Sequence, residues 1–384
     1  MSVQQYTFPI TKLVVGEEAY LQLPQILEEL ECKKILIVTD KVLFDIGVTS
    51  TVTSTLSQFD IEVYAEIQGD PTVSAVENGL KIMKEMGAQC IVAIGGGSSI
   101  DAAKAISILA KNDIPILQTE GIDKFTEEPV PIVAIPTTAG TGSEVSPAAV
   151  ITNEEENRKF TIRSWRIAPK VAILDPIMLE TLPEKIAAAT SMDAFCHNIE
   201  YFLAKSASSL SEGVNLQAIR MINQNIRDFV ADRTNKIAAK EMLIASMIGE
   251  ISFALLRLSI NHAIAHPLGA HFKIHHGLAC AIMLPYSLRY NFEYCIDKLP
   301  LVAQAMDIDI SGLDKRQASE RAIEEIEKLI DDLNIPKGLK EFGIKETDIP
   351  ILAKDAMKST QLVVNPRPVS QEDIENILLE AISK

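Results

Sequence analysis

Residues 90–111 read CIVAIGGGSSIDAAKAISILAK, and this stretch decides the fold of the N-terminal half. It begins with a run of apolar, largely β-branched residues, which is typical of a strand that is buried on both faces. Three glycines follow, and then apolar residues recur at three- and four-residue spacing, which indicates a helix. A strand, a glycine-rich turn and a helix in this order predict one unit of a doubly wound α/β fold.

The same alternation continues on both sides of this stretch. Apolar runs of five to nine residues alternate with a further helical pattern, so we expect a parallel, Rossmann-like sheet with helices on its faces. The other strand candidates are residues 33–40, 61–67, 130–138, 148–152 and 171–175, and the further helix is expected at 73–87.

Strand signals stop near Pro183, and the rest of the chain has helical patterns. With 384 residues the chain is long enough for two domains, since single cores rarely exceed about 250–300 residues. We therefore expect an α/β domain at 1–182 and an all-helical domain at 183–384. The expected helices of the second domain are 213–232, 235–266, 276–292, 317–333 and 370–383.

Composition excludes several classes of partner. The formal net charge is −16 and no cluster of lysine or arginine stands out, so nucleic acid is not an expected partner. No apolar run reaches the roughly 20 residues of a membrane span. The N-terminus lacks the pattern of a secretory signal, and the five cysteines are scattered without CxxC spacing. We expect a cytoplasmic protein with reduced thiols.

Two glycine- and hydroxyl-rich loops follow consecutive strand candidates. Gly95, Gly96 and Gly97 precede a helix, where backbone N–H groups and the helix dipole favour phosphate, and Ser98 and Ser99 are candidate caps of that helix. The second loop reads IPTTAGTGSEVS, residues 135–146. Each loop alone is equally consistent with a well-capped turn, and neither is a GxGxxG fingerprint or a P-loop. Together they favour a dinucleotide-binding domain.

Five of the six histidines lie in NHAIAHPLGAHFKIHHG, residues 261–277. His262 and His266 are four residues apart, as are Asp193 and His197 in MDAFCHNIE, so each pair projects from one helix face. His276 opens the next expected helix, beyond a break at residues 267–269. A lone histidine on an apolar helix is usually a core residue, but one carboxylate with several imidazoles suits Fe²⁺ or Zn²⁺.

These motifs together resemble the iron-containing (group III) alcohol dehydrogenases, in the superfamily of dehydroquinate synthase and glycerol dehydrogenase. The matching motifs are GGGSSIDAAKAI, PTTAGTGSEV, DPIMLETLP, MDAFCHNIE and NHAIAHPLGAHFKIHHG. The chain looks most similar to the lactaldehyde reductase and 1,3-propanediol dehydrogenase branch. The resemblance implies a metal- and NAD-dependent oxidoreductase that acts on short-chain primary alcohols or aldehydes.

The resemblance also implies roles for single residues. It makes His266 the catalytic residue beside the nicotinamide, and it places Lys159 near the nicotinamide ribose. A carboxylate at Asp40, in the adenine-ribose position, favours NAD(H) over NADP(H). The implied metal ligands are Asp193, His197, His262 and His276, and the implied phosphate and nucleoside contacts are Gly96, Gly97, Ser98, Thr137, Thr138 and Thr141. The metal is expected to be Fe²⁺, with Zn²⁺ as the competitor.

Departures from the family pattern leave the substrate open. Cys196 replaces a threonine beside His197, and Arg257 replaces a glycine in the segment before His262. Phe253 and Arg257 are the substrate candidates. Arg257 is expected either to pair with a carboxylate such as Glu250, to point to solvent, or to recognise an anionic group on a short aldehyde. His271 and His275 match no ligand position.

Three functional alternatives remain from the sequence. A dehydroquinate synthase-like lyase needs more basic residues than these motifs supply, and a glycerol dehydrogenase-like enzyme shares the same superfamily. A non-catalytic relative is disfavoured because the expected ligands and both loops are intact. We expect a homo-oligomer, a dimer or a multiple of one, with a small-molecule substrate.

Overall fold

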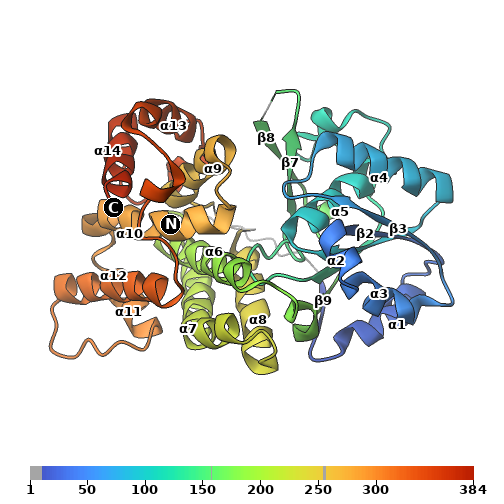
Figure 1. Cartoon of the computed structure of the whole chain (residues 1–384), viewed down its shortest axis with the longest axis horizontal. Helices are drawn as coiled ribbons and strands as arrows, with labels where there is room; N and C mark the ends of the chain where they lie inside the picture. The colour runs from blue at the N-terminus through green and yellow to red at the C-terminus, as the bar shows by residue number, and fades with distance from the viewer. Residues whose placement is uncertain (1–10, 157, 254–256) are drawn as a thin grey trace. The chain divides into compact units, whose positions relative to one another are not determined.

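The structure, a computed structural model, describes residues 11–156, 158–253 and 257–384, apart from the side chain of Phe253 (Figure 1). Its internal contacts divide the chain into two compact units, Met1–Leu182 and Pro183–Lys384. The first unit is α/β and the second is helical, so the predicted fold class is confirmed.

The first unit is built on a six-stranded sheet in which every neighbouring pair is parallel. The strand order is β1-β9-β6-β4-β2-β3. The strands are β1 (Lys12–Val15), β2 (Lys34–Asp40), β3 (Asp60–Ile67), β4 (Cys90–Gly95), β6 (Ile132–Pro136) and β9 (Val171–Leu174).

Burial on both faces explains why the central strands are continuously apolar. All residues of β4, β6 and β9 are buried. Helices α4 and α5 cover one face of the sheet, and α1 and α3 lie on the other (Figure 1). These helices are α1 (Leu23–Glu29), α3 (Val48–Thr53), α4 (Val73–Met86) and α5 (Gly97–Leu109), and a short α2 (Lys41–Asp45) follows β2.

The connection of the strands changes direction between β2 and β4. From β2 the chain moves outward to β3 and then crosses back to β4, which pairs with β2 on its other side. Ligands of open parallel sheets bind at the carboxyl ends of strands at such a switch point. Asp40 ends β2 and the glycine loop follows β4, so both lie at this switch point.

A second, three-stranded sheet has the order β5-β8-β7. β7 (Ala148–Asn153) was an expected strand, but it pairs antiparallel with β8 (Arg158–Arg163) outside the main sheet. β8 and the two-residue β5 (Gly121–Ile122) have no apolar run that predicts them, since β8 reads RKFTIR.

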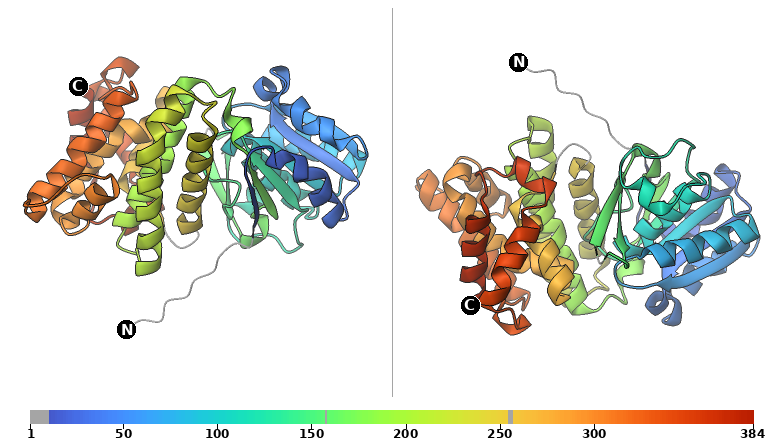
Figure 2. Two further views of the ribbon diagram at one scale, coloured as in Figure 1. Left: turned by 90° about the horizontal axis from the view of Figure 1, so that it is seen from below. Right: turned by 90° about the horizontal axis from the view of Figure 1, so that it is seen from above.

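The second unit consists of helices and loops in the part of it that the structure describes (Figure 2). α6 packs against α7, α8 and α10, while α9 packs against α10 and α13. The helices are α6 (Glu184–Leu203), α7 (Ser209–Ala231), α8 (Lys236–Phe253), α9 (Ile260–Phe272), α10 (His276–Cys295), α11 (Leu299–Ala305), α12 (Lys315–Asp332), α13 (Ile349–Ala356) and α14 (Gln371–Ile382).

The helices on either side of His262 differ from the sequence prediction at two points. The expected helix 235–266 is two helices, because residues 257–259 lie outside both α8 and α9. The expected break at residues 267–269 is also wrong: Pro267 lies inside α9, which continues to Phe272 and ends at Lys273 in a left-handed conformation (φ 58°). A proline was read as a helix terminator, but packing of α9 against α10 and α13 keeps the helix intact.

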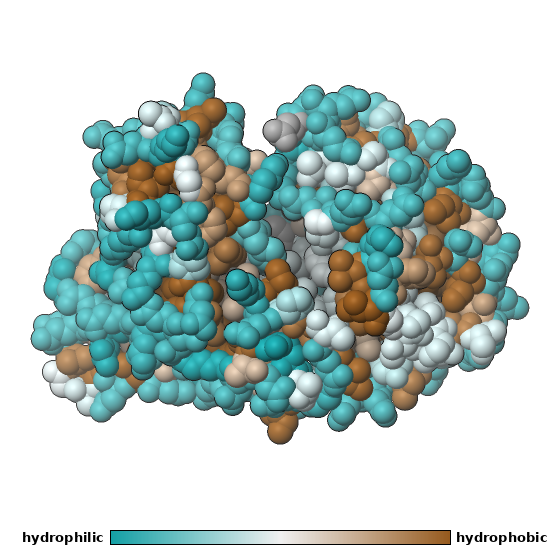
Figure 3. Space-filling model, viewed as in Figure 1, coloured by the Kyte–Doolittle hydropathy of each residue, from teal (hydrophilic) through white to brown (hydrophobic). Residues whose placement is uncertain are grey.

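The visible face of each unit is mostly hydrophilic (Figure 3), in keeping with 23% charged residues. None of the helices in the described ranges combines the length and hydropathy that crossing a membrane requires.

Candidate functional site

α6 carries a polar face inside an otherwise apolar helix. It is buried along most of its 20 residues, and Asp193, His197 and Glu200 recur on it at spacings of four and three. All three side chains are buried. Burial of charged groups is costly unless partners compensate, so this face requires partners from neighbouring helices.

α9 and α10 supply those partners. His262 is fully buried on α9, and His276 is the first residue of α10. Gly277 allows α10 to approach α6, because a Cβ at this position would lie 2.3 Å from the carbonyl oxygen of Ala189. Because Gly277 has no side chain, α10 can pack close enough to α6 to bring His276 near Asp193.

Three imidazole nitrogens surround one carboxylate oxygen. Asp193 Oδ1 lies 3.9 Å from Nε2 of His197, 3.5 Å from Nε2 of His262 and 3.7 Å from Nε2 of His276. The His197 and His262 rings are stacked at 4.7 Å, and the His262 and His276 rings meet edge-on at 5.3 Å. The structure therefore brings together the four side chains that were expected to be ligands.

Unsatisfied buried atoms at this point fit a divalent metal. Asp193 Oδ1 and His262 Nε2 are buried and have no hydrogen-bond partner in the described structure. Buried polar atoms are almost always hydrogen-bonded, so two facing orphans require another partner. A carboxylate oxygen with imidazole nitrogens is a ligand set that Fe²⁺ and Zn²⁺ accept.

Glu200 and Glu250 stand behind two of the histidines. Glu200 Oε2 contacts Nδ1 of His262, while its Oε1 accepts hydrogen bonds from the Ser259 hydroxyl (2.5 Å) and backbone N–H (2.9 Å). Glu250 Oε1 lies 3.7 Å from Nδ1 of His197. A carboxylate that contacts Nδ1, as Glu200 does, orients a ligating histidine, whereas Glu250 is too distant from His197 for a hydrogen bond. Neither contact was expected from the sequence, although Glu200 lies seven residues after Asp193 in the quoted motif.

The charges in this cluster shift each other's proton affinity. Burial alone raises the pKa of the Asp193 carboxyl, but His197 and the other two histidines more than offset it, so the pKa lies below its usual range. Burial likewise raises the pKa of Glu200, and the charge and hydrogen bond of His262 lower it overall. Both carboxylates are therefore held in the ionised form that orients histidines or binds a cation.

The remaining histidines separate into two kinds. His266 is exposed on α9, and its ring stacks on that of His276 with the centroids 5.3 Å apart, so it lies at the edge of the cluster. His271 binds Asp355 Oδ2 through Nε2 at 2.8 Å, and His275 is the exposed residue before α10.

Cys280 is a further candidate ligand that the sequence analysis missed. One ligand atom each from Asp193, His262, His276 and Cys280 lie within 4.8 Å of one another. Cys280 is fully buried, and burial raises the pKa of its thiol to about 12. The available signal was its position four residues after His276, one turn along the same helix face.

In the first unit, the glycine loop forms the start of α5. Gly96 occupies the N-cap position, so the expectation that Ser98 and Ser99 cap this helix is wrong. Both serines lie in its first turn, and Gly95 has φ 157° with Ser99 Oγ 2.5 Å from where a Cβ would be. Gly96, Gly97 and Ser98 are partly accessible. Their N–H groups belong to the unpaired donors of a helix N-terminus, which favours phosphate.

The second loop packs directly on the first. A Cβ on Gly97 would be 2.9 Å from the Thr141 side chain, and one on Gly96 would be 3.4 Å from Thr138. Thr137 is buried and donates its N–H to the Gly95 carbonyl at 3.0 Å. The predicted residues of the two loops thus pack together at the ends of β4 and β6.

A buried lysine fixes the second loop to α5. Lys104 is fully buried and donates to Ser143 Oγ (2.7 Å) and to the carbonyl of Ala148 (2.6 Å). Asp101 accepts from Ser143 Oγ at 2.5 Å and from the N–H of Val150 at 2.9 Å. This network was not anticipated, because Lys104 reads as a solvated position in a helical pattern.

Asp40 and Lys159 take part in local contacts. Asp40 Oδ1 caps α2 by accepting from the N–H of Leu43 at 2.9 Å. Its Oδ2 makes no hydrogen bond with any described residue and is available to a hydroxyl. Lys159 is half-exposed on β8 and pairs with Asp70 Oδ2 at 2.7 Å.

Of the two substrate candidates, the structure describes the side chain of Arg257 but not that of Phe253. The side chain of Phe253 lies outside the described residues. Arg257 is partly buried and donates to the carbonyl of Thr360 at 3.4 Å, so the suggested pair with Glu250 is not formed. Glu250 faces His197 instead.

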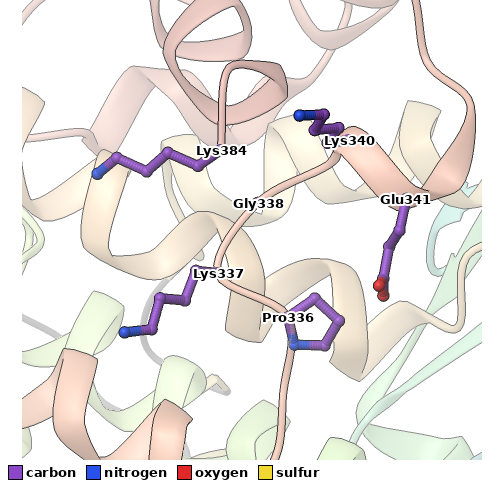
Figure 4. A pocket seen from close by; sticks show the side chains of 6 residues that line it. All are labelled: Pro336, Lys337, Gly338, Lys340, Glu341 and Lys384. Atoms are coloured by element: carbon purple, nitrogen blue, oxygen red, sulfur yellow. The ribbon is translucent and has the colours of Figure 1, made fainter.

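A hollow of about 320 Å³ on the second unit is lined mainly by charged side chains (Figure 4). Lys337 and Lys384 extend to the same side there, while Glu341 points away. Lys337 is also paired with Asp331 at 2.7 Å. The hollow shares no residue with the histidine cluster. It is lined by Pro336, Lys337, Gly338, Lys340, Glu341 and Lys384.

Comparison with known families covers almost the whole chain. Residues 10–176 match the family model of iron-containing alcohol dehydrogenases, and residues 187–382 match the model of the C-terminal part of the same family.

Individual relatives agree with this match. The chain is 37% identical to 1,3-propanediol dehydrogenase of Klebsiella pneumoniae, over 96% of this chain and 94% of that protein. It is 36% identical to lactaldehyde reductase of Escherichia coli, over 89% and 90%. A crystal structure of 1,3-propanediol oxidoreductase superposes with a TM-score of 0.96 at 35% identity, covering 98% of this chain and 100% of that one. The crystal structure of sulfoacetaldehyde reductase from Bifidobacterium kashiwanohense in complex with NAD⁺ superposes with a TM-score of 0.91 at 26% identity, and both chains are covered in full.

Proposed function

The chain belongs to the iron-containing alcohol dehydrogenase family, and on that premise we propose that it interconverts a short-chain primary alcohol and its aldehyde with NAD(H). The observation that carries the proposal is the cluster of Asp193, His197, His262 and His276, with two facing orphan atoms. Relatives with more than 30% identity that act on alcohols and aldehydes favour this reading over a dehydroquinate synthase-like or glycerol dehydrogenase-like enzyme.

In the second unit, Asp193, His197, His262 and His276 would hold Fe²⁺, or Zn²⁺ in its place. A metal bound there supplies a Lewis acid for the substrate oxygen. Glu200 holds the His262 ring in place through Nδ1 and leaves Nε2 directed at Asp193. His266 is exposed beside His276, and we assign it the relay of the hydroxyl proton between substrate and solvent.

In the first unit, we propose that the two loops and Asp40 hold the dinucleotide. The N–H groups of Gly96, Gly97 and Ser98 suit its pyrophosphate, because they begin a helix. The nicotinamide supplies hydride acceptance and donation. We place Thr137, Thr138 and Thr141 along the adenosine and pyrophosphate, although Thr137 acts from a buried position, and Lys159 near the nicotinamide ribose.

A further part of the proposal concerns the chemical nature of the substrate. We propose that Arg257 recognises an anionic group on a short aldehyde, because its one bond to a described residue is a long one to a carbonyl oxygen. A guanidinium fork matches carboxylate, phosphonate or sulfonate. The similarity to sulfoacetaldehyde reductase from Bifidobacterium kashiwanohense supports this class of substrate.

The main test is NADH formation from a panel of short alcohols by metal-defined enzyme. We expect Asp193→Ala and His262→Ala each to abolish turnover and to lower metal content, while circular dichroism stays close to that of the wild type. A chelated protein with full activity, or a wild type that turns over no member of the panel with Fe²⁺ or Zn²⁺, contradicts the proposal.

The test of Arg257 compares Arg257→Gly on matched neutral and anionic aldehydes. We expect KM for the anionic aldehyde to rise by roughly 10- to 150-fold, the equivalent of a lost charge-assisted pair of about 1.5–3 kcal/mol. KM for neutral aldehydes should change little, and Arg257→Lys should recover part of the loss. Equal losses on both kinds of substrate assign Arg257 a structural role instead.

The proposal includes a cytoplasmic location and a homo-oligomer, a dimer or a multiple of one. All five cysteines are free and buried, which suits a reducing compartment. Sedimentation equilibrium measures the oligomeric state directly, and a monomer at micromolar concentration contradicts that part.

A further inference from the structure

Cys280 lies in the cluster without a role in the proposed reaction. It is fully buried on α10, one turn after His276, and its Sγ is 3.8 Å from Nε2 of His276. Its backbone carbonyl accepts from Nδ2 of Asn261 at 3.1 Å, which ties this turn of α10 to the start of α9 next to His262. The thiol is therefore held among the candidate ligands by both neighbouring helices.

The separations around Cys280 are those of atoms that share one cation. Ligands about 2.0 Å from a tetrahedral metal lie about 3.3 Å apart, and a sulfur at about 2.3 Å lies about 3.5 Å from its neighbours. Asp193 Oδ1 is 3.5 Å from His262 Nε2 and 3.7 Å from His276 Nε2. The 3.8 Å between His276 and Cys280 is in the same range. The separations of Cys280 Sγ from the ligand atoms of Asp193 and His262 are also within 4.8 Å, so rotation of these side chains toward a cation closes the set.

A buried cysteine is often only a packing residue, so a second observation is needed. The orphan atoms Asp193 Oδ1 and His262 Nε2 supply it, because both belong to the residues grouped with Cys280. His197 is absent from that compact group, although its Nε2 lies 3.9 Å from Asp193 Oδ1. Cys280 is thus the fourth member of the group whose ligand atoms all lie within 4.8 Å of one another.

We propose that Cys280 Sγ is a ligand of the metal that Asp193, His262 and His276 hold, so that this centre has one sulfur donor. The assignment rests on the metal-dependent function proposed above. On binding, the thiol gives up its proton to solvent and the sulfur lone pair forms the bond to the cation. Thiolate is a soft ligand, so the centre prefers Zn²⁺ over Fe²⁺ more strongly than an all-nitrogen and oxygen set does.

The test is X-ray absorption at the zinc edge on the full-length protein loaded with Zn²⁺. We expect one sulfur at about 2.3 Å beside nitrogen and oxygen at about 2.0–2.1 Å. Cys280→Ser should lose the sulfur contribution. Cys196→Ser is the matched control, because Cys196 is also fully buried and adjoins His197 on α6, and it should keep the sulfur.

A second readout is metal competition. The zinc affinity should fall at least ~10-fold in Cys280→Ser, because losing even an outer-shell partner costs about 10- to 100-fold. The ratio of zinc to iron affinities should fall with it, because the soft ligand is lost, and both quantities should stay unchanged in Cys196→Ser. A wild-type spectrum with nitrogen and oxygen only overturns the proposal, and this measurement needs no variant to fold. Sulfur that persists in Cys280→Ser also overturns it. Zinc bound without sulfur leaves the proposed function intact, whereas a wild type that binds no metal overturns both.

Discussion

The two carboxylate oxygens of Asp40 differ in their contacts. Oδ1 caps α2, while Oδ2 is available at the switch point of the sheet. A carboxylate there accepts hydrogen bonds from the two ribose hydroxyls of NAD(H) and repels a 2′-phosphate. We therefore propose that this one side chain sets the coenzyme preference.

Replacing Asp40 should shift that preference. We expect Asp40→Gly to raise the ratio of kcat/KM for NADPH to that for NADH by roughly tenfold or more, because one like-charge repulsion worth at least about 1.4 kcal/mol is removed. Asp40→Asn is the control, since it keeps the helix cap and removes only the charge, and it should shift the ratio in the same direction. A wild-type enzyme that already prefers NADPH contradicts this assignment.

Helix packing sets the geometry of the cluster formed by Asp193 and the three histidines around it. Asp193 and His197 come from α6, His262 from α9 and His276 from α10, so the cluster exists only while these helices keep their spacing. α10 packs closely on the backbone of α6 at Gly277, where a Cβ would lie 2.3 Å from the Ala189 carbonyl oxygen. A methyl group at this position would also lie 3.1 Å from Cβ of Asp193, so it should disturb the candidate metal site.

Gly277→Ala tests this coupling. The added Cβ would lie 2.3 Å from the Ala189 carbonyl oxygen, and we expect overpacking to lower the free energy of unfolding by about 1–3 kcal/mol and to weaken metal binding. Gly213→Ala on α7 is the control, because no atom lies within 4 Å of the new methyl group. It should be neutral or stabilising by about 0.5–1 kcal/mol. Urea unfolding and chelator competition measure both effects, and wild-type values for Gly277→Ala would refute the coupling.

At the scale of the whole molecule, two compact units carry two different candidate sites. The two loops proposed to bind the dinucleotide belong to Met1–Leu182, and the histidine cluster proposed to bind the metal belongs to Pro183–Lys384. Because a ligand stabilises the part of the chain that binds it, each ligand should protect its own unit first.

Amide hydrogen exchange separates these effects. Removing metal with a chelator should speed exchange in α6, α9 and α10 and leave β4 and α5 unchanged. Adding NADH at 100 times its Kd should slow exchange at the start of α5 by up to about 100-fold, the equivalent of about 2.7 kcal/mol. Exchange in α6 that is indifferent to the chelator would contradict the metal site.

Periodicity and motif spacing in the sequence determined the α/β class, the helical second half and the residues of the candidate site. Strand alternation and the four-residue spacings of Asp193 with His197 and of His262 with His266 are local features, each of which one element encodes by itself. The end of α9 at Lys273 was misjudged, because Pro267 signals a break locally while packing keeps the helix intact.

Only the tertiary structure decided which side chains stand behind and beside those residues. Glu200 and His262 are 62 positions apart, and they meet because α6 and α9 lie against a common partner, α10. Cys280 is one turn from His276 in the sequence, but its proximity to Asp193 depends on the contact at Gly277. Contacts of this kind follow from the packing of whole helices, which no local pattern of residues specifies.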